Sequence, residues 1–191
     1  MDDVRRAVTP DVKAAGDPVY LAGVTRDERG ASAYHRLAAA EAGTPERFGG
    51  EVPRVDPVAA RALYETMARA HDRGLLRSSR TPAMGGLAVA LAMTALGGDL
   101  GLDIDLSAVP AEGGLDDDAL LFSESNSRFV LTCAPGRTEE LEDCFEGRPC
   151  ARLGAVTEER RLRVRGASGR LVIDAALDDL RKAFKRTLGR L

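Results

Sequence analysis

A helix start that can hold a phosphate is the first candidate for chemistry in this sequence. From Leu75 to Gly98 an extended stretch runs through Pro82 into Gly85 and Gly86, which open a helix without ionisable side chains. Glycines at a helix start leave backbone N–H groups free to face an anion, and the helix dipole adds favourable charge. The alternative is that the two glycines only let a buried helix pack closely.

A polar loop is the second candidate. The run from Phe122 to Arg128 places three hydroxyls, an amide, a carboxylate and a guanidinium directly before an expected strand. Ser123, Glu124, Ser125 and Arg128 can together bind a phosphate or a ribose there. The alternative is a capped turn closed by an Arg–Glu pair on the surface, because serine and asparagine are common turn residues.

The histidines and cysteines do not form a recognisable catalytic or metal-binding motif. His35 and His71 are the only histidines, neither has triad or ligand partners nearby in the sequence, and we expect both to be surface or helix-packing residues. Cys133, Cys144 and Cys150 are odd in number and lack C-x-x-C spacing, which argues against a disulfide framework and a thiolate zinc site. A reducing cytoplasm fits this cysteine content best.

Strands and helices that would position these candidates follow from the hydrophobic patterns. Apolar runs and alternation predict strands at 18–24, 75–79, 102–106, 129–133, 150–156, 161–165 and 171–174. Helical spacing and capping residues predict helices after Ser32, from Asp56-Pro57 to Gly74, from Gly86, at 116–122, after Thr138 and from Leu177 through Leu188. Strands and helices alternate in the first half of the chain, and short strands cluster in the second half. This pattern predicts one α/β or α+β domain over residues 1–191, with a mixed sheet that carries helices.

Composition excludes several classes of protein. The chain is 44% hydrophobic and 30% charged, as a folded globular domain should be, and its net charge of −3 gives no overall attraction to nucleic acid or to an anionic membrane. The start MDDVRRAVTPDVK lacks the apolar core of a signal peptide. The helix from Gly86 is too short to span a bilayer; since it is apolar on every face, we expect it to be covered on all sides.

The C-terminal part is locally basic. From Glu158 onwards it holds ten Lys/Arg against five Asp/Glu, and Arg161, Arg163 and Arg165 share one strand face. Its only aromatic residue, Phe184, is at an expected core position, whereas nucleic-acid binding needs exposed aromatic or groove-reading partners. We therefore expect a solvated face or a surface that docks against an acidic sister domain.

Four segments together resemble a known enzyme domain. They are GDPVYLAGVTRDERGASAY, LLRSSRTPAMGGLAVALAMTALGG, LLFSESNSRFVLT and CARLGAVTEERRLRVRG. In this order and spacing they resemble the C-terminal domain of the synthetase subunit of the phosphoribosylformylglycinamidine synthase family, in the aminoimidazole ribonucleotide synthetase superfamily. The resemblance covers nearly the whole chain: residues 1–16 resemble the lead from a preceding domain, and LDDLRKAFKRTL resembles the closing helix.

The resemblance implies a partner domain and cofactors. In this superfamily a nucleotide-binding sister domain and a domain of this type form the active site together. The family's reaction uses ATP, Mg²⁺ and ammonia from a glutaminase subunit or domain to convert a formylglycinamide ribonucleotide into its amidine. Such phosphoryl transfer needs metal and positive charge around the phosphates rather than a protein nucleophile.

The sequence departs from the family where metal and acid–base chemistry would be expected. The family pattern Ser-(Cys/Ala)-His-Asp-x-Ser-(Asp/Glu)-Gly-Gly-Leu is SSRTPAMGGL at residues 78–87 here, and the usual Ala-Glu-Met is Ala92-Met93-Thr94. The imidazole and three carboxylates are thus absent, whereas Gly30-Ala31-Ser32 is a milder change and residues 123–128 keep the family pattern. The resemblance thus implies no catalytic or metal-binding residue in this chain.

Three functions follow as hypotheses. The first is a structural half-site of the synthase that is inactive alone, and the second is a free-standing partner or regulatory module. The third is a metal-free anion- or nucleotide-binding module in which Arg80 supplies the positive charge of the missing metal. The candidate phosphate- or nucleotide-binding residues are Arg80, Gly85, Gly86, Ser123, Glu124, Ser125 and Arg128.

Overall fold

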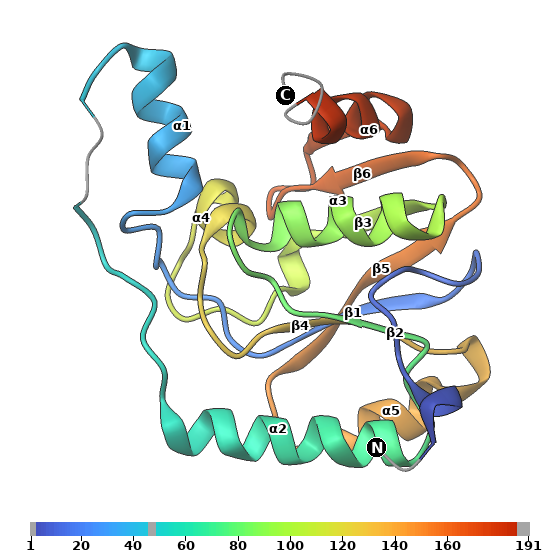
Figure 1. The fold of residues 1–191 in the computed structure, drawn as a ribbon. Coiled ribbons are helices and arrows are strands. Elements are labelled where there is room, and N and C mark those ends of the chain that lie inside the picture. Colours follow the sequence, from blue (N-terminus) through green and yellow to red (C-terminus); the bar gives the residue numbers. More distant parts are fainter. Residues whose placement is uncertain (1–2, 46–48, 187–191) are drawn as a thin grey trace.

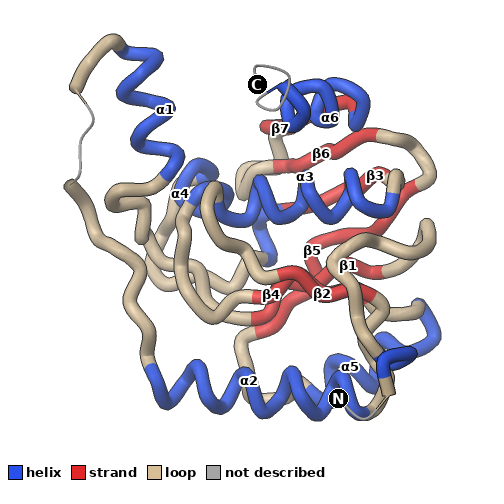
Figure 2. Tube along the Cα trace, viewed as in Figure 1, coloured by secondary structure: helices blue, strands red, loops and turns tan. Residues whose placement is uncertain are grey.

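A seven-stranded mixed sheet runs through the computed structural model, which describes residues 3–45 and 49–186 (Figures 1 and 2). The strands are β1 (Pro18–Ala22), β2 (Ser78–Arg80), β3 (Gly101–Asp105), β4 (Phe129–Thr132), β5 (Cys150–Thr157), β6 (Arg161–Arg165) and β7 (Leu171–Ala176). Their order is β2-β4-β1-β5-β3-β6-β7, in which β3 and β6 pair in parallel and the other neighbours pair antiparallel. The predicted mixed sheet is confirmed.

Helices lie on both faces of this sheet. They are α1 (Ala33–Ala42), α2 (Pro57–Asp72), α3 (Gly86–Gly98), α4 (Asp117–Phe122), α5 (Thr138–Cys144) and α6 (Leu177–Arg186), with 3-10 turns at Val4–Arg6, Leu106–Ala108 and Pro135–Arg137. Helices α3, α4 and α6 cover one face, and α2 and α5 cover the other. Figure 1 shows α1 standing out from this layered body.

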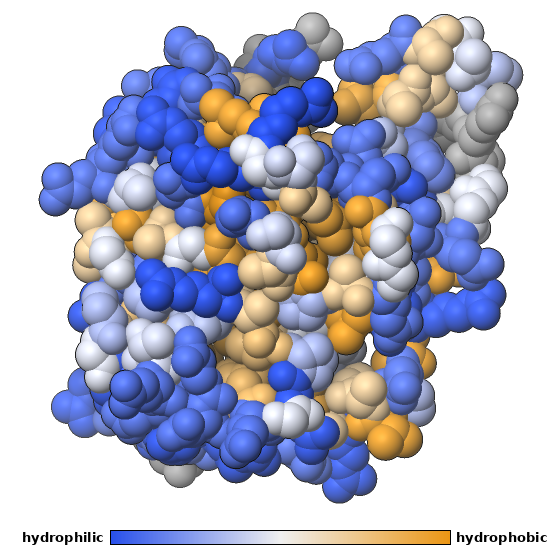
Figure 3. Space-filling model, turned by 180° about the vertical axis from the view of Figure 1, so that it is seen from behind, coloured by the Kyte–Doolittle hydropathy of each residue, from blue (hydrophilic) through white to orange (hydrophobic). Residues whose placement is uncertain are grey.

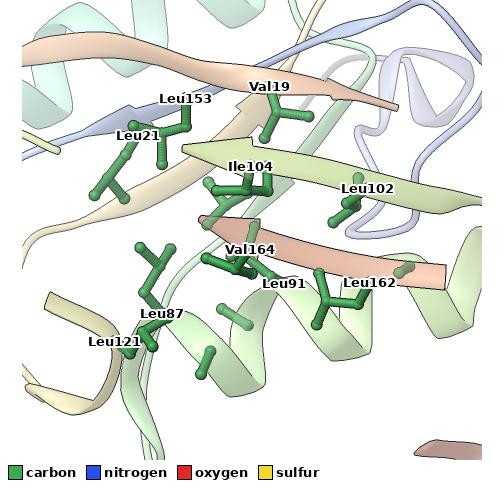
Figure 4. Packing of buried hydrophobic residues seen from close by; sticks show 14 of the residues in the cluster. Val19, Leu21, Leu87, Leu91, Leu102, Ile104, Leu121, Leu153, Leu162 and Val164 are labelled. Carbon is green, nitrogen blue, oxygen red and sulfur yellow. The ribbon is translucent and has the colours of Figure 1, made fainter. Parts of the chain in front are cut away.

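The core forms because alternate residues of each central strand point to opposite helical layers. In β1, Val19 and Leu21 pack in the larger cluster with α3, whereas Tyr20 and Ala22 pack in the smaller cluster with α2 and α5. All five residues of β1 are buried, as expected for a strand covered on both faces. Figure 4 shows side chains of α3, including Leu91, directed toward the strands.

Two helix starts agree closely with the sequence prediction. The hydroxyl oxygen of Ser32 accepts the N–H of His35 at 3.3 Å, at the start of α1. One carboxylate oxygen of Asp56 accepts the N–H groups of Val58 and Ala59 at 2.9 and 3.0 Å, at the start of α2. Both caps satisfy backbone donors that a helix start leaves without partners.

Several predicted boundaries were wrong. Strand β2 lies at 78–80 rather than 75–79, and strand β3 ends at Asp105, whose carboxylate accepts the N–H of Ser107 and so starts a 3-10 turn. Thr138 does not cap α5: its hydroxyl donates to the carbonyl of Pro135. Leu188, predicted on the last helix, lies outside the described residues.

Two predictions of burial were also wrong. Helix α3 is not covered on all sides, because Val89 is 42% exposed, although Leu87 and Leu91 on the sheet side are fully buried. Phe184 is 54% exposed rather than in the core. A helix without ionisable side chains thus leaves part of its apolar surface unpacked within the described chain. None of the helices in the described ranges is long and apolar enough to cross a membrane.

The basic strand face is paired with acidic side chains of the same chain, and whether it is solvated or docks against a sister domain stays a prediction. Arg161 and Arg163 contact the Asp174 carboxylate at 2.7 and 3.7 Å, and Arg163 also contacts Glu159. Arg165 pairs with the carboxylate of Asp103. All three arginines therefore have acidic partners within the chain.

The lead segment packs against the sheet domain. The N–H of Ser79 donates to the carbonyl of Thr9 at 3.2 Å, along the outer edge of β2. Val12 is buried, and its N–H donates to the carbonyl of Thr94 on α3 at 3.4 Å. That residues 1–16 come from a preceding domain stays a prediction.

Candidate functional site

The start of α3 needs its two glycines for backbone geometry and for close packing. Gly85 and Gly86 have φ angles of +82° and +63°, in the left-handed region that favours glycine. A Cβ atom on Gly86 would lie 2.6 Å from the carbonyl oxygens of both Leu121 and Ser123. The last turn of α4 and the residue after it thus approach the start of α3 so closely that a side chain on Gly86 would not fit.

A carboxylate of the chain itself contacts this helix start. Oε1 of Glu124 accepts the N–H of Gly85 at 2.8 Å and the N–H of Ala33, the first residue of α1, at 3.1 Å. Both N–H groups lie at the positive ends of helix dipoles, where a negative charge is stabilised. Glu124 therefore supplies an anion at the place for which the sequence predicted a phosphate.

Arg128 is a buried structural residue. Its Nε donates to the carbonyl of Ser125 and its Nη1 to the hydroxyl of Thr25, both at 3.0 Å, while Nη2 donates to the carbonyl of Ser123. Burial lowers the pKa of Arg128 to about 10, although the nearby charges of Glu28 and Glu124 favour the charged form. The alternative of an Arg–Glu pair on the surface was wrong, because Arg128 is 0% exposed.

The two serines of the loop are also directed inward. The hydroxyl oxygen of Ser125 accepts the N–H of Arg26 at 3.0 Å, which holds the loop to the segment after β1. The hydroxyl of Ser123 is buried without a hydrogen-bond partner among the described residues. The loop therefore uses most of its polar groups to hold the ends of β1, α4 and β4 together.

The predicted site residues thus divide into two groups. Gly85, Gly86 and Glu124 meet at the start of α3, and Ser123, Ser125 and Arg128 form a buried network behind it. Arg80 joins neither group: it is half-buried at the end of β2, and its side chain makes no hydrogen bond or ion pair with any residue in 3–45 or 49–186. The sequence prediction missed Thr25, whose contact with Arg128 has no local signal.

Glu28 was missed for the same reason. It is 5% exposed, and its Oε1 accepts the N–H of Arg54 at 2.9 Å, which fastens residues 50–54 beside the segment that follows β1. Only the fold brings these two segments together.

The residues at this helix start do not fit a magnesium ion. Mg²⁺ requires oxygen ligands, of which carboxylates are the usual protein donors, and residues 78–87 and 92–94 contain none. Oε1 of Glu124, the nearest carboxylate oxygen, already accepts two N–H groups. Within the described part of the chain, no three His, Cys, Asp or Glu side chains are arranged to hold a metal.

The histidines and cysteines show no arrangement for catalysis among the described residues. Nε2 of His71 lies 3.0 Å from the carbonyl of Arg6, and the ring of His35 lies 5.9 Å from that of Tyr34. The three cysteines are free thiols, and burial raises the pKa of Cys150 to about 12. A thiol with such a pKa is a poor nucleophile at neutral pH.

Comparison with known proteins agrees with this architecture. Residues 14–167 match the family model of the AIR synthase related protein, C-terminal domain. The chain is 34% identical over 190 residues to the phosphoribosylformylglycinamidine synthase subunit PurL of Cutibacterium acnes, covering 98% of this chain and 23% of that protein. The PurL of Thermococcus sibiricus is also 34% identical, over 154 residues, covering 79% of this chain and 20% of that protein. The chain thus spans a fifth to a quarter of the length of these relatives.

Solved structures show the same fold. Thermotoga maritima PurL complexed with FGAR superposes with a TM-score of 0.76 at 21% identity, covering 93% of this chain and 30% of that one. The hydrogenase maturation protein HypE of E. coli superposes with a TM-score of 0.61 at 20% identity, covering 86% and 50%. Since the family match spans most of the chain and relatives share a third of its residues, the chain belongs to the AIR synthase related proteins, as a C-terminal domain of that family.

Proposed function

We propose that this chain is the C-terminal domain of an ATP-dependent phosphoribosylformylglycinamidine synthase of purine biosynthesis, and that it serves as a structural half-site. In this role it completes and orients an active site whose nucleotide-binding sister domain binds ATP and Mg²⁺. A glutaminase subunit or domain supplies ammonia, and the enzyme works in the cytoplasm. The isolated domain does not turn over.

The observation that carries this proposal is the contact of Glu124 with the start of α3. A phosphate that approached Gly85 would meet a negative charge already hydrogen-bonded to that N–H at 2.8 Å. The neighbouring segment 78–87 contains no carboxylate or imidazole to act as a base or to bind a metal. Such a helix start can position a neighbouring domain, but it lacks the groups that phosphoryl transfer requires.

Exposed hydrophobic side chains support a role in docking to another domain. Met84 and Val89, at the start of α3, are 70% and 42% exposed. Exposed apolar side chains that lie close together at a helix start suit a surface that is covered in an assembly. Figure 3 shows further hydrophobic residues among hydrophilic ones, on the face opposite that of Figure 1.

A domain exchange tests the proposal. The chain replaces the C-terminal domain of a complete synthase, and the chimera is assayed for ATP-dependent amidine formation with ammonia and with glutamine. We expect a folded chimera that keeps activity, and no activity from the isolated chain at the same concentration. The matched control is a synthase from which the C-terminal domain is deleted.

Two results would contradict a structural half-site. Turnover by the isolated chain would show that it carries its own catalytic groups. A folded but inactive chimera would show that the domain does not complete this active site, and would favour the free-standing partner or regulatory module instead.

A further inference from the structure

Three arginines line a cavity that shares no residue with the start of α3. Arg26 follows β1, Arg54 precedes α2, and Arg148 precedes β5, so three distant segments contribute one guanidinium each. The cavity has a volume of about 100 Å³. That is several times the roughly 10–15 Å³ that one water needs, and below the roughly 300–1,000 Å³ of pockets for drug-sized ligands. It therefore suits one small charged group rather than a nucleotide.

The remaining lining is mostly apolar, with two further polar side chains. Ala60 and Leu63 of α2 form part of the lining, and Asn126 and Ser127 at the tip of the polar loop add an amide and a hydroxyl. A pocket with apolar walls and a few converging polar groups is the usual form of a small-ligand site.

The loop tip is held in an unusual backbone conformation beside this cavity. Ser127 has a φ of +55°, in the left-handed region that residues other than glycine rarely adopt, and its hydroxyl lies 2.8 Å from the hydroxyl of Tyr64 on α2. A Cβ atom on Gly23 would lie 2.2 Å from the Ser127 carbonyl, so only glycine permits this close approach. The fold thus fixes Ser127 at the cavity despite the strain.

The guanidinium groups are available to a ligand. Arg148 makes no side-chain hydrogen bond or ion pair with the residues that the structure describes. Arg26 donates to Glu112 at 2.8 and 2.6 Å, and Arg54 lies 3.2 Å from Glu51, with the two glutamates 60% and 70% exposed. Ion pairs with such exposed partners contribute little to stability, so an anion in the cavity can replace them.

The charge of the lining matches a dianion. Three arginines and one carboxylate, that of Asp56, line the cavity, and the Asp56 carboxylate already accepts two N–H groups of α2. The net charge is thus +2. A phosphate monoester carries a charge of about −2 above its second pKa of about 6.

We propose that this cavity binds the phosphate group of a phosphate monoester. Arg148 is its principal ligand, and Arg26 and Arg54 turn to it from their exposed glutamates. The site goes beyond the function proposed above, because it lies away from Gly85 and shares none of the residues that make the start of α3.

Titration of the intact chain with inorganic phosphate at constant ionic strength tests this site. We expect saturable binding that weakens below pH 6, where phosphate becomes a monoanion. Arg148→Gln should raise the Kd about ten-fold, as expected for a charge-assisted hydrogen-bonding partner. Arg170→Gln, which removes an exposed arginine outside the cavity, is the matched control and should leave the Kd within about two-fold.

Two further variants separate this site from the start of α3 and from unfolding. Arg80→Gln should leave phosphate binding unchanged, whereas Glu112→Gln should free Arg26 and lower the Kd, a gain that a damaged fold cannot produce. No saturable binding up to about 20 mM phosphate, an unchanged Kd in Arg148→Gln, or a larger loss in Arg80→Gln than in Arg148→Gln would each overturn the proposal.

Discussion

Removal of the Glu124 carboxylate should destabilise the whole domain. In Glu124→Ala the N–H groups of Gly85 and Ala33 lose a charged acceptor at 2.8 and 3.1 Å. A hydrogen bond to a charged group contributes about 1.5–3 kcal/mol when buried, and we take about half of this for each of the two bonds because Glu124 is only partly buried. The loss of unfolding free energy is then about 1.5–3 kcal/mol, or roughly 3–12 °C in Tm for a chain of this size.

Urea unfolding of three variants measures this loss. Glu124→Gln keeps an acceptor oxygen without the charge, so we expect it to lose about 1 kcal/mol, between the wild type and Glu124→Ala. Glu158→Ala removes an exposed carboxylate and serves as the control. A stability loss in Glu124→Ala no larger than that in Glu158→Ala would show that this carboxylate does not stabilise the two helix starts.

Three further predictions concern packing and titration. Gly86→Ala should lose about 3 kcal/mol of unfolding free energy in urea, whereas Gly74→Ala, at a similar φ but in open space, should lose only about 1 kcal/mol; equal losses would contradict the close approach at α3. Leu91→Ala should cost about 2–5 kcal/mol against under 1 kcal/mol for the exposed Val89→Ala, as measured by thermal unfolding. Because burial raises the pKa of Cys150 to about 12, the folded state holds this proton more tightly than the unfolded state. Stability should therefore fall as pH rises from about 9 towards 12, and Cys150→Ala should lessen that fall in pH-dependent unfolding curves.

Elements whose cause is local could be predicted from the sequence. Asp56 followed by Pro57 sets the start of α2, because a carboxylate cap and a fixed φ both act within one turn. The buried strand β1 follows from a short apolar run between turn signals, although it ends at Ala22 rather than at the predicted Val24. Thr138 does not cap α5, because the helix begins at Thr138 itself and its hydroxyl donates to the carbonyl of Pro135 in the preceding turn.

The candidate site was harder to predict, because long-range contacts decide which of its side chains are exposed. The run from Phe122 to Arg128 has the composition of a binding loop, yet Arg128 is buried against Thr25, more than a hundred positions earlier. The double contact of Glu124 likewise joins two helix starts that only the fold brings together. Helix α3 shows the reverse case, since its sequence predicts burial but does not say whether the covering surface belongs to the same chain.

The order of strands in the sheet bears on synthesis by the ribosome. Val19 in β1, near the start of the chain, pairs with Thr132 in β4 on one side and with Gly154 in β5 on the other. The centre of the sheet therefore cannot be completed until the chain beyond β5 has left the exit tunnel, and β1 lacks its second neighbouring strand until then. Because such non-local pairings form slowly, the nascent domain should depend on a chaperone during this interval.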